Sequence, residues 1–347
     1  MLESMKSNGS KRETVLKYYD VATSFVSKLP GGLQRPILRE MTPIREVYLE
    51  TRPVRLMLMG ASPEAFLAEL AGADKKIEAG ANDNGWREYR VEDIGRAQIF
   101  HAGDECSKDF VAAALARFQP DAVVVCGFGG DALRTVDFVA TTEAAVIGWV
   151  AEEHVAATVA QLAEHPVLAK RGVRIFPLND RAGFETAICD ALPLCAQLEF
   201  SWVAGAKHLQ AALAKRLLKS FSAVCGVIGL QPIPLADMPI LVTLQMLMVS
   251  LIVHTTGRRA DVRMIGEFFG ALGINVGLGF GFRELARSLI KVIPFGNAVS
   301  GALAAAGTYA IGQAAITYFI DVQPLERVSA TFREWRETRK AKIGDGK

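Results

Sequence analysis

Short apolar runs alternate with longer amphipathic stretches between residues 54 and 192. Nearly continuous apolar runs are typical of strands that are buried on both faces of a sheet, and the stretches between them have helical spacing. The expected strands are Val54–Met59, Arg87–Val91, Ala97–Phe100, Ala122–Gly127, Ala144–Val150 and Val173–Pro177. The expected helices are Pro63–Leu70, Lys108–Phe118, Ala132–Thr142, His154–Ala163 and Ala182–Leu192. This alternation predicts an α/β domain with a mostly parallel sheet.

The connection between the second and third expected strands differs from the others. Only the segment 92–96 joins them, which is too short for a crossover helix, so these two strands are expected to form an antiparallel hairpin. The prediction is a mostly parallel, six-stranded sheet with one antiparallel strand. That arrangement resembles the fold of Ras-like GTPases.

The rest of the chain reads as helical. Two amphipathic helices, 12–29 and 33–49, are expected to pack as an arm on the sheet domain, and Leu194–Leu218 reads as one long helix. Four uncharged runs follow: Ser220–Ala236, Met238–Gly257, Phe268–Phe282 and Val292–Ile320. The expected domains are an arm (1–50), an α/β domain (51–192), an all-α hydrophobic domain (193–324) and a basic tail (325–347).

Charge is distributed unevenly along the chain. The 39 basic and 37 acidic residues nearly cancel, to a net charge of +2, so the balance does not indicate a nucleic-acid partner. However, only ten charged residues fall between Ser220 and Ile320. Such a segment is typical of a deeply buried helical core or of a membrane segment.

The segment after the first strand lies where a Ras-like sheet carries its phosphate loop. The GxxxxGK[ST] loop cradles phosphates with backbone N–H groups, while its Lys reaches the phosphates and its hydroxyl binds Mg²⁺. Here the loop begins at Gly60, but Ala65, Phe66 and Leu67 replace the second Gly, the Lys and the hydroxyl. The run RPVRLMLMGASPEAFLAEL therefore resembles the start of an Era-like GTPase domain that has lost its catalytic groups.

Two further GTPase motifs are degenerate in the same way. Gly103 matches the Gly of DxxG, but Phe100 stands where the Mg²⁺-linked Asp is expected. The segment 151–154 stands where the guanine-reading NKxD is expected and reads Ala-Glu-Glu-His. The resemblance therefore implies a GTPase-like domain with no catalytic residues and no cofactor.

The second half of the chain, about residues 203–322, carries a more distinctive resemblance. The runs CGVIGLQPIPLADMPILVTLQMLMVSLI and EFFGALGINVGLGFGFRELARSLIKVIPFGNAVSGALAAAGTYAIGQAAITYFI are similar to the YcjF-like family, a family of unknown function (family 697). This unit is often fused behind Era-like GTPase domains. The resemblance implies an architecture and a membrane association, not a reaction.

Membrane contact and tight packing in a soluble helical hairpin both remain possible interpretations of the uncharged runs. Met238–Gly257 just reaches the length of about 20 residues that crosses a bilayer. Small residues recur at helical spacing, as at Gly301 and Ala305, and let helix backbones approach closely. Basic residues border the runs and could hold anionic lipid headgroups or solvate helix ends: Arg258, Arg259, Arg283, Arg287 and Lys291.

One enzyme-like alternative is a dinucleotide site. Gly127, Gly129 and Ala132 fit G-x-G-x-x-[GA] after a strand, and Glu152 follows the next strand as a ribose-binding acid would. His101, Asp104, Glu105 and Cys106 form a loop cluster that lacks a further spaced metal ligand, so a solvated loop is favoured. The five cysteines have no zinc or redox spacing, and no signal peptide is visible at the start.

These observations lead to one hypothesis. The chain is expected to be a non-catalytic, GTPase-like scaffold or regulator at the cytoplasmic face of a bacterial-type inner membrane, with a cytoplasmic location as the alternative. Lipid is the expected partner, and a protein partner or a second copy is possible. Nucleotide or dinucleotide binding by the 127–132 loop, and residual GTP binding, are the alternative functions.

Overall fold

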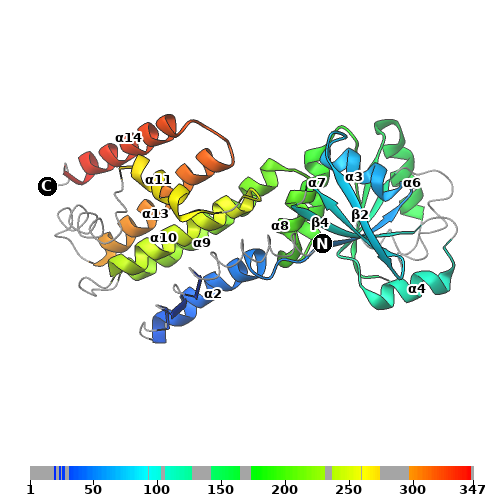
Figure 1. Cartoon of the computed structure of the whole chain (residues 1–347), viewed down its shortest axis with the longest axis horizontal. Coiled ribbons are helices and arrows are strands. Elements are labelled where there is room, and N and C mark those ends of the chain that lie inside the picture. The colour runs from blue at the N-terminus through cyan, green and yellow to red at the C-terminus, as the bar shows by residue number, and fades with distance from the viewer. Residues whose placement is uncertain are drawn as a thin grey trace. The chain divides into compact units, whose positions relative to one another are not determined.

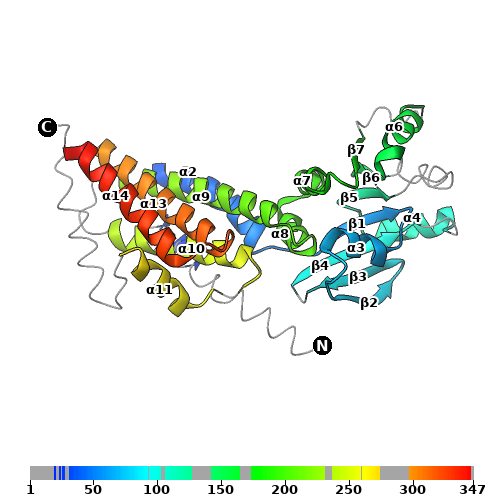
Figure 2. The same cartoon turned by 90° about the horizontal axis from the view of Figure 1, so that it is seen from above.

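The computed structural model describes residues 19–20, 23–24, 26–27, 31–92, 94–102, 106–126, 142–164, 173–230, 237–258, 260–273 and 297–344. The chain divides into two compact units, shown in Figures 1 and 2. One unit, Glu46–Leu209, contains the sheet and is called the sheet unit. The other, called the helical unit, combines Met1–Arg45 with Gln210–Lys347.

The sheet unit has an α/β architecture with a mixed, mostly parallel sheet. Its strand order is β2-β3-β4-β1-β5-β6-β7. The strands are β1 (Val54–Met59), β2 (Ile77–Asp83), β3 (Trp86–Val91), β4 (Gly95–His101), β5 (Ala122–Cys126), β6 (Ala145–Val150) and β7 (Arg174–Pro177). All six expected strands are therefore present. The expected antiparallel pairing is confirmed, because β3 pairs with β4 in that sense while β4, β1, β5, β6 and β7 pair in parallel.

The expected count of six strands is wrong, because β2 adds a seventh at the edge. It pairs antiparallel with β3, so β3 is the one described strand that runs opposite to the other six. The turn between them consists of Asn84 and Gly85, both at positive φ (52° and 88°). Two residues at positive φ match the type I′ turn that joins the strands of a tight hairpin.

Helices cover both faces of the sheet. On one face, α3 (Pro63–Ala71), α7 (Arg181–Ala191) and α8 (Leu194–Val203) share a core with the strands. On the other face, α4 (Lys108–Arg117) packs over Met57, Phe100 and Val123. The 3-10 helix η1 (Glu152–His154) and α6 (Val155–Glu164) follow β6. Because helices cover both faces of the sheet, both sets of side chains on the central strands are buried, and these strands are continuous apolar runs in the sequence.

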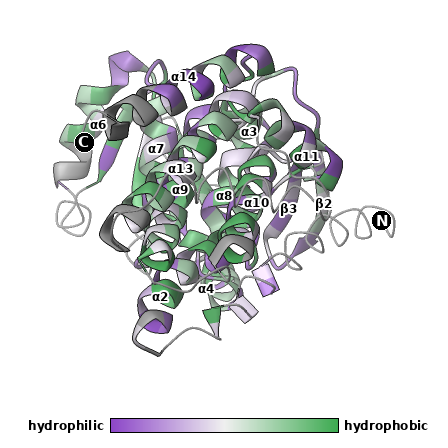
Figure 3. Ribbon diagram, turned by 90° about the vertical axis from the view of Figure 1, so that its left-hand side faces the viewer, coloured by the Kyte–Doolittle hydropathy of each residue, from purple (hydrophilic) through white to green (hydrophobic). Residues whose placement is uncertain are grey.

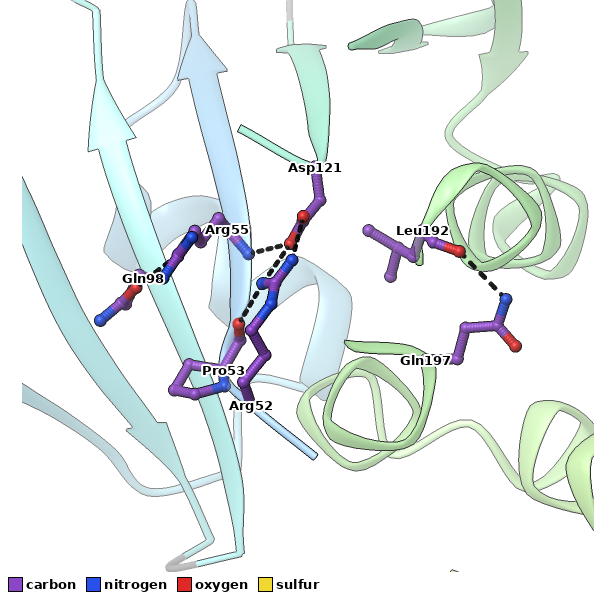
Figure 4. Close-up of polar contacts among 7 residues, drawn as sticks. All are labelled: Arg52, Pro53, Arg55, Gln98, Asp121, Leu192 and Gln197. Atoms are coloured by element: carbon purple, nitrogen blue, oxygen red, sulfur yellow. Dashed lines mark hydrogen bonds and ion pairs between the residues drawn. The ribbon is translucent and has the colours of Figure 1, made fainter. Parts of the chain in front are cut away.

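Charged side chains tie the amino ends of β1 and β5 together (Figure 4). The Arg52 guanidinium donates two hydrogen bonds to the Asp121 carboxylate, one at 2.8 Å. Asp121 also accepts the backbone N–H of Arg55 at 2.9 Å, and the Arg55 side chain donates to Gln98 on β4 at 3.1 Å. This cluster lies at the amino ends of the parallel strands, and ligands of such sheets bind at the carboxyl ends.

The single long helix expected over Leu194–Leu218 is wrong. The structure has two helices there, α8 and α9 (Lys207–Gly229), separated by a turn at Gly205 with φ +61°. A glycine adopts this left-handed conformation without strain and ends helices for that reason. The first helix lies on the sheet, where Glu199 accepts from Arg96 of β4 at 2.6 Å.

The helical unit is built on α10, whose residues are apolar all around the helix. Its described helices are α2 (Gly31–Tyr48), α9, α10 (Asp237–Thr255), α11 (Val262–Ala271), α13 (Asn297–Phe319) and α14 (Leu325–Gly344). From Leu247 to Val253 every side chain of α10 is fully buried or nearly so. The hydropathy colouring in Figure 3 shows the apolar character of this part of the chain. Within the described residues, no helix combines the length and the apolar composition needed to span a membrane.

Small residues bring α9 and α13 close together. A Cβ added at Gly226 would lie 3.1 Å from the Cβ of Ala305, and one added at Gly301 would lie 2.8 Å from the carbonyl oxygen of Gly226. The Gly301 and Ala305 stripe therefore packs against another helix of the same unit. A Cβ at Gly307 would meet nothing within 4 Å.

The helical unit combines described helices from the first and the last parts of the sequence. The expected arm helix 33–49 is present as α2, but residues up to Arg45 cluster with the helical unit instead of the sheet domain. Its buried stripe of Ile37, Met41 and Ile44 has helical spacing. The segment expected as a basic tail forms α14, which packs on α13 and α11 and buries Val328 and Phe332. The expected helix 12–29 lies largely outside the described residues.

Candidate functional site

The candidate site begins at the turn after β1, where Gly60 adopts φ +87°. Three residues, Gly60 to Ser62, connect β1 to α3. The GxxxxGK[ST] pattern spans six residues from its first to its second glycine, and those residues must wrap around a phosphate. Here Pro63, at the fourth position of that pattern, already begins the helix. The connection is therefore shorter than the loop that this pattern forms around a phosphate.

The amino end of α3 already binds acceptors from its own chain. The Ser62 hydroxyl accepts the backbone N–H of Ala65 at 3.2 Å, and Pro63 has no N–H to offer. The Glu64 carboxylate stands in the first turn and accepts a hydrogen bond from the Tyr89 hydroxyl at 3.0 Å. Burial, followed by the bond to Glu64, raises the pKa of Tyr89 and keeps its hydroxyl protonated. A negative charge thus lies where a phosphate would bind.

The two residues that replace the phosphate-loop Lys and hydroxyl are part of the core. Phe66 and Leu67 are 2% and 0% exposed. The Phe66 ring meets Trp149 of β6 edge-on at 6.2 Å, and Trp149 stacks on Phe184 of α7 at 4.4 Å. These positions hold the helix on the sheet, and neither can neutralise phosphate charge.

The carboxyl end of β4 is equally apolar. Phe100, at the position of the expected Mg²⁺-linked Asp, is fully buried and packs against Trp86 and Phe110 with ring centroids 5.7 and 6.0 Å apart. Gly103 lies outside the described residues. Within the described part of the chain, no group of three or more His, Cys, Asp or Glu side chains could hold a metal ion.

The carboxyl end of β6 carries exposed polar residues. Glu152 to His154 form η1, and all three side chains are exposed. The Glu152 carboxylate accepts a hydrogen bond from the Asn179 side chain at 3.0 Å, next to the start of α7. This contact joins two neighbouring connections at the edge of the sheet. Gly127, Gly129 and Ala132, the other members of the dinucleotide alternative, lie outside the described residues.

Two buried groups near this edge were not anticipated from the sequence. Among the residues that the structure describes, the Trp149 indole N–H has no hydrogen-bond partner, although the side chain is 2% exposed. Cys126 ends β5 beside Trp149, and burial raises the pKa of its thiol to about 12. The thiol therefore stays protonated at neutral pH and is a poor nucleophile.

A buried carboxylate joins α7 to the first turn of α9, and sequence reasoning missed it as well. The Arg181 guanidinium donates to Glu185 at 2.6 Å and to the Ala204 carbonyl at 3.0 Å. The His208 Nδ1 lies 3.7 Å from Glu185. Burial raises the pKa of Glu185, while Arg181 and then His208 lower it. The spacing of Arg181 and Glu185, four residues apart on one helix, is the signal that could have revealed the pair.

Of the five basic residues expected to contact lipid, the structure describes one. Arg258 follows the end of α10 and is exposed. Arg259, Arg283, Arg287 and Lys291 lie outside the described residues. Comparison with protein-family models and with curated proteins found no match to this chain.

Proposed function

We propose that this protein is a non-catalytic, GTPase-like scaffold or regulator that associates with a membrane. The observation that carries the proposal is the turn from Gly60 to Ser62. It lies where a Ras-like sheet has its phosphate loop, but it is only three residues long. The strand order from β3 to β7 supports a Ras-like sheet, with β2 as an added edge strand. The resemblance of residues 203–322 to the YcjF-like family supports the membrane association.

Loss of nucleotide binding follows from three independent changes at one place. The turn is short, the helix end is capped by Ser62, and the Glu64 charge repels phosphate. Each change alone weakens phosphate binding at a helix amino end, which depends on free N–H groups and on the helix dipole. Together they favour a role in binding partners over a role in hydrolysis.

A titration with a fluorescent GTP analogue tests the nucleotide part. The full chain is mixed with the analogue with and without Mg²⁺, and no saturable signal is expected. The variant Glu64→Gln separates charge from geometry: it removes the repulsion but leaves the turn, so it is also expected to bind nothing. Micromolar, Mg²⁺-dependent binding by the unaltered chain would overturn the proposal, and the same titration with NADH tests the dinucleotide alternative.

Sedimentation with lipid vesicles tests the membrane part. Binding to vesicles that contain phosphatidylglycerol is expected to exceed binding to phosphatidylcholine alone and to fall with salt, because the expected contacts are basic. The double variant Arg258→Gln with Arg259→Gln should weaken it, and Lys215→Gln on α9 is the matched control. Absence of sedimentation with both vesicle types would refute this part of the proposal.

A further inference from the structure

A groove of about 400 Å³ lies between α2 and α9, both within the helical unit. The two helices lie side by side in Figures 1 and 2. The residues that matter for its chemistry are Arg35, Ile37, Arg39, Ala223, Val224 and Val227. Its volume falls within the range of roughly 300–1,000 Å³ that is typical of small-molecule sites.

The inner surface of the groove is apolar. Ile37 and Val224 are 1% and 2% exposed, and Val227 is half-buried. Ala223 is exposed and has the smallest side chain of the α9 wall. Because its side chain is a single methyl group, Ala223 leaves room that a larger residue would fill. An apolar ligand that covers this surface would be stabilised by the removal of both apolar surfaces from water.

Two cations stand beside this apolar surface. Arg35 and Arg39 are four residues apart on α2, so their side chains share one face of the helix, and both are exposed. In the part of the chain that the structure describes, neither has an ion-pair partner. Glu40 also lines the groove, so these three side chains together carry one net positive charge. Guanidinium groups bind phosphate and carboxylate with paired hydrogen bonds.

We infer that this groove binds an acyl chain of an anionic lipid, with the headgroup at Arg35 and Arg39. An apolar floor beside two exposed guanidinium groups is complementary to an amphiphile with a negative end. Both walls are helices, so the groove offers an extended peptide no strand edge to pair with. The inference rests on the proposed membrane association as the source of the lipid, and it names the lipid class.

The test is a calorimetric titration of the full chain with dodecyl phosphate below its micellar concentration. Dodecyltrimethylammonium, which has the same chain and the opposite charge, is the ligand control. The variant Ala223→Leu fills the groove, and Ala212→Leu places the same change at an exposed position of α9 outside it. The double variant Arg35→Gln with Arg39→Gln removes the charge, and Lys215→Gln is its control.

Saturable binding of dodecyl phosphate, weakened about tenfold or more by Ala223→Leu and severalfold by the arginine double variant, is the expected result. Both control variants should bind as the unaltered chain does, and the cationic amphiphile should bind more weakly. No binding to the unaltered chain, or equal effects of Ala223→Leu and Ala212→Leu, would overturn the inference. If the chain sediments with vesicles but does not bind dodecyl phosphate, the groove inference is overturned and the proposed membrane association stands. If the chain binds dodecyl phosphate but does not sediment with vesicles, the proposed membrane association is overturned and the groove remains a lipid-binding site.

Discussion

The two units differ in whether their described ion pairs include buried carboxylates. In the sheet unit, some ion pairs have a buried carboxylate, whereas others such as Asp83–Arg117 are exposed: the carboxylates of Asp121 and Glu199 are 7% and 2% exposed beside their arginines. In the helical unit, the Arg263–Glu267 pair of α11 is exposed, and the centre of the bundle is apolar. Over α10, the low charge of the second half of the chain is therefore explained by burial: α10 lies at the centre of the bundle, surrounded by other helices. A helix that is apolar all round is typical of such a core as well as of a membrane span.

The largest effect is expected from placing a lysine at position 66, where the GxxxxGK[ST] pattern would have one. Phe66→Lys removes a core aromatic group and places an ammonium group where the side chain is 2% exposed, so the free energy of unfolding should fall by more than about 4 kcal/mol. Urea unfolding followed by tryptophan fluorescence measures this, since Trp86, Trp149 and Trp202 lie in the sheet unit. Phe66→Leu is the control and should cost less. A stable Phe66→Lys variant that binds a GTP analogue would contradict the interpretation of this turn.

The next largest effect concerns the buried pair at the amino ends of β1 and β5. Asp121→Ala leaves the Arg52 guanidinium and the Arg55 N–H without their acceptor and should cost about 2–3 kcal/mol. The matched control is Asp83→Ala, because the Asp83–Arg117 pair is more than half exposed on both sides and should contribute less than about 1 kcal/mol. Equal losses in the two variants, measured by the same unfolding experiment, would remove the contrast between buried and exposed pairs.

The helical unit has its own matched pair of positions on α13. Gly301→Ala adds a Cβ 2.8 Å from the backbone oxygen of Gly226 and should destabilise the unit by about 1–3 kcal/mol. Gly307→Ala adds the same group where nothing lies within 4 Å, so it should stabilise by about 0.5–1 kcal/mol through helix propensity. Thermal unfolding followed by far-ultraviolet circular dichroism compares them. Changes of the same sign would show that α9 and α13 do not pack closely here.

Strand positions were predictable because apolar runs mark them directly. The strand β2 was not predicted, because nearly all of its side chains are exposed and its sequence has no apolar run. The signal was in the turn, since Asn84 and Gly85 before a strand are typical of a hairpin. The break at Gly205 was missed because the residues on both sides have helical spacing, and one glycine does not reveal its φ.

At the candidate site, the residue types could be read from the sequence, but the contacts that they make could not. From the sequence, Phe66 and Leu67 are expected at the positions where a phosphate loop has its Lys and hydroxyl, but the contact of Tyr89 with Glu64 depends on how β3 lies relative to α3. The association of Glu185 with His208 likewise depends on the turn at Gly205. Contacts between elements that are distant in sequence follow from the tertiary fold, which periodicity does not encode.

A smaller effect, of opposite sign, is expected at the end of α13. Val322 has φ +56°, a left-handed conformation that is strained for a β-branched residue, and its side chain is exposed. Val322→Gly should therefore raise the free energy of unfolding by about 1 kcal/mol. Val322→Ala keeps most of the backbone strain and serves as the control. A loss of stability in the glycine variant, measured by circular dichroism, would show that the valine side chain makes a contact that outweighs its strain.

The smallest expected effect is a pH dependence in the sheet unit. Burial raises the pKa of Glu185 above the ordinary value that the unfolded chain has, so between the two values the folded state binds more protons. The stabilisation that Glu185 contributes is therefore complete below the ordinary pKa of a glutamate, and it is lost as pH rises through the higher pKa of the folded state. Glu185→Gln should lack this dependence, because its amide does not ionise although its oxygen can still accept from Arg181. Urea unfolding across that window, repeated with His208→Gln to remove the neighbouring imidazole, should show the unaltered chain losing stability relative to Glu185→Gln as pH rises. Parallel profiles would mean that the carboxyl group of Glu185 has the same pKa in both states.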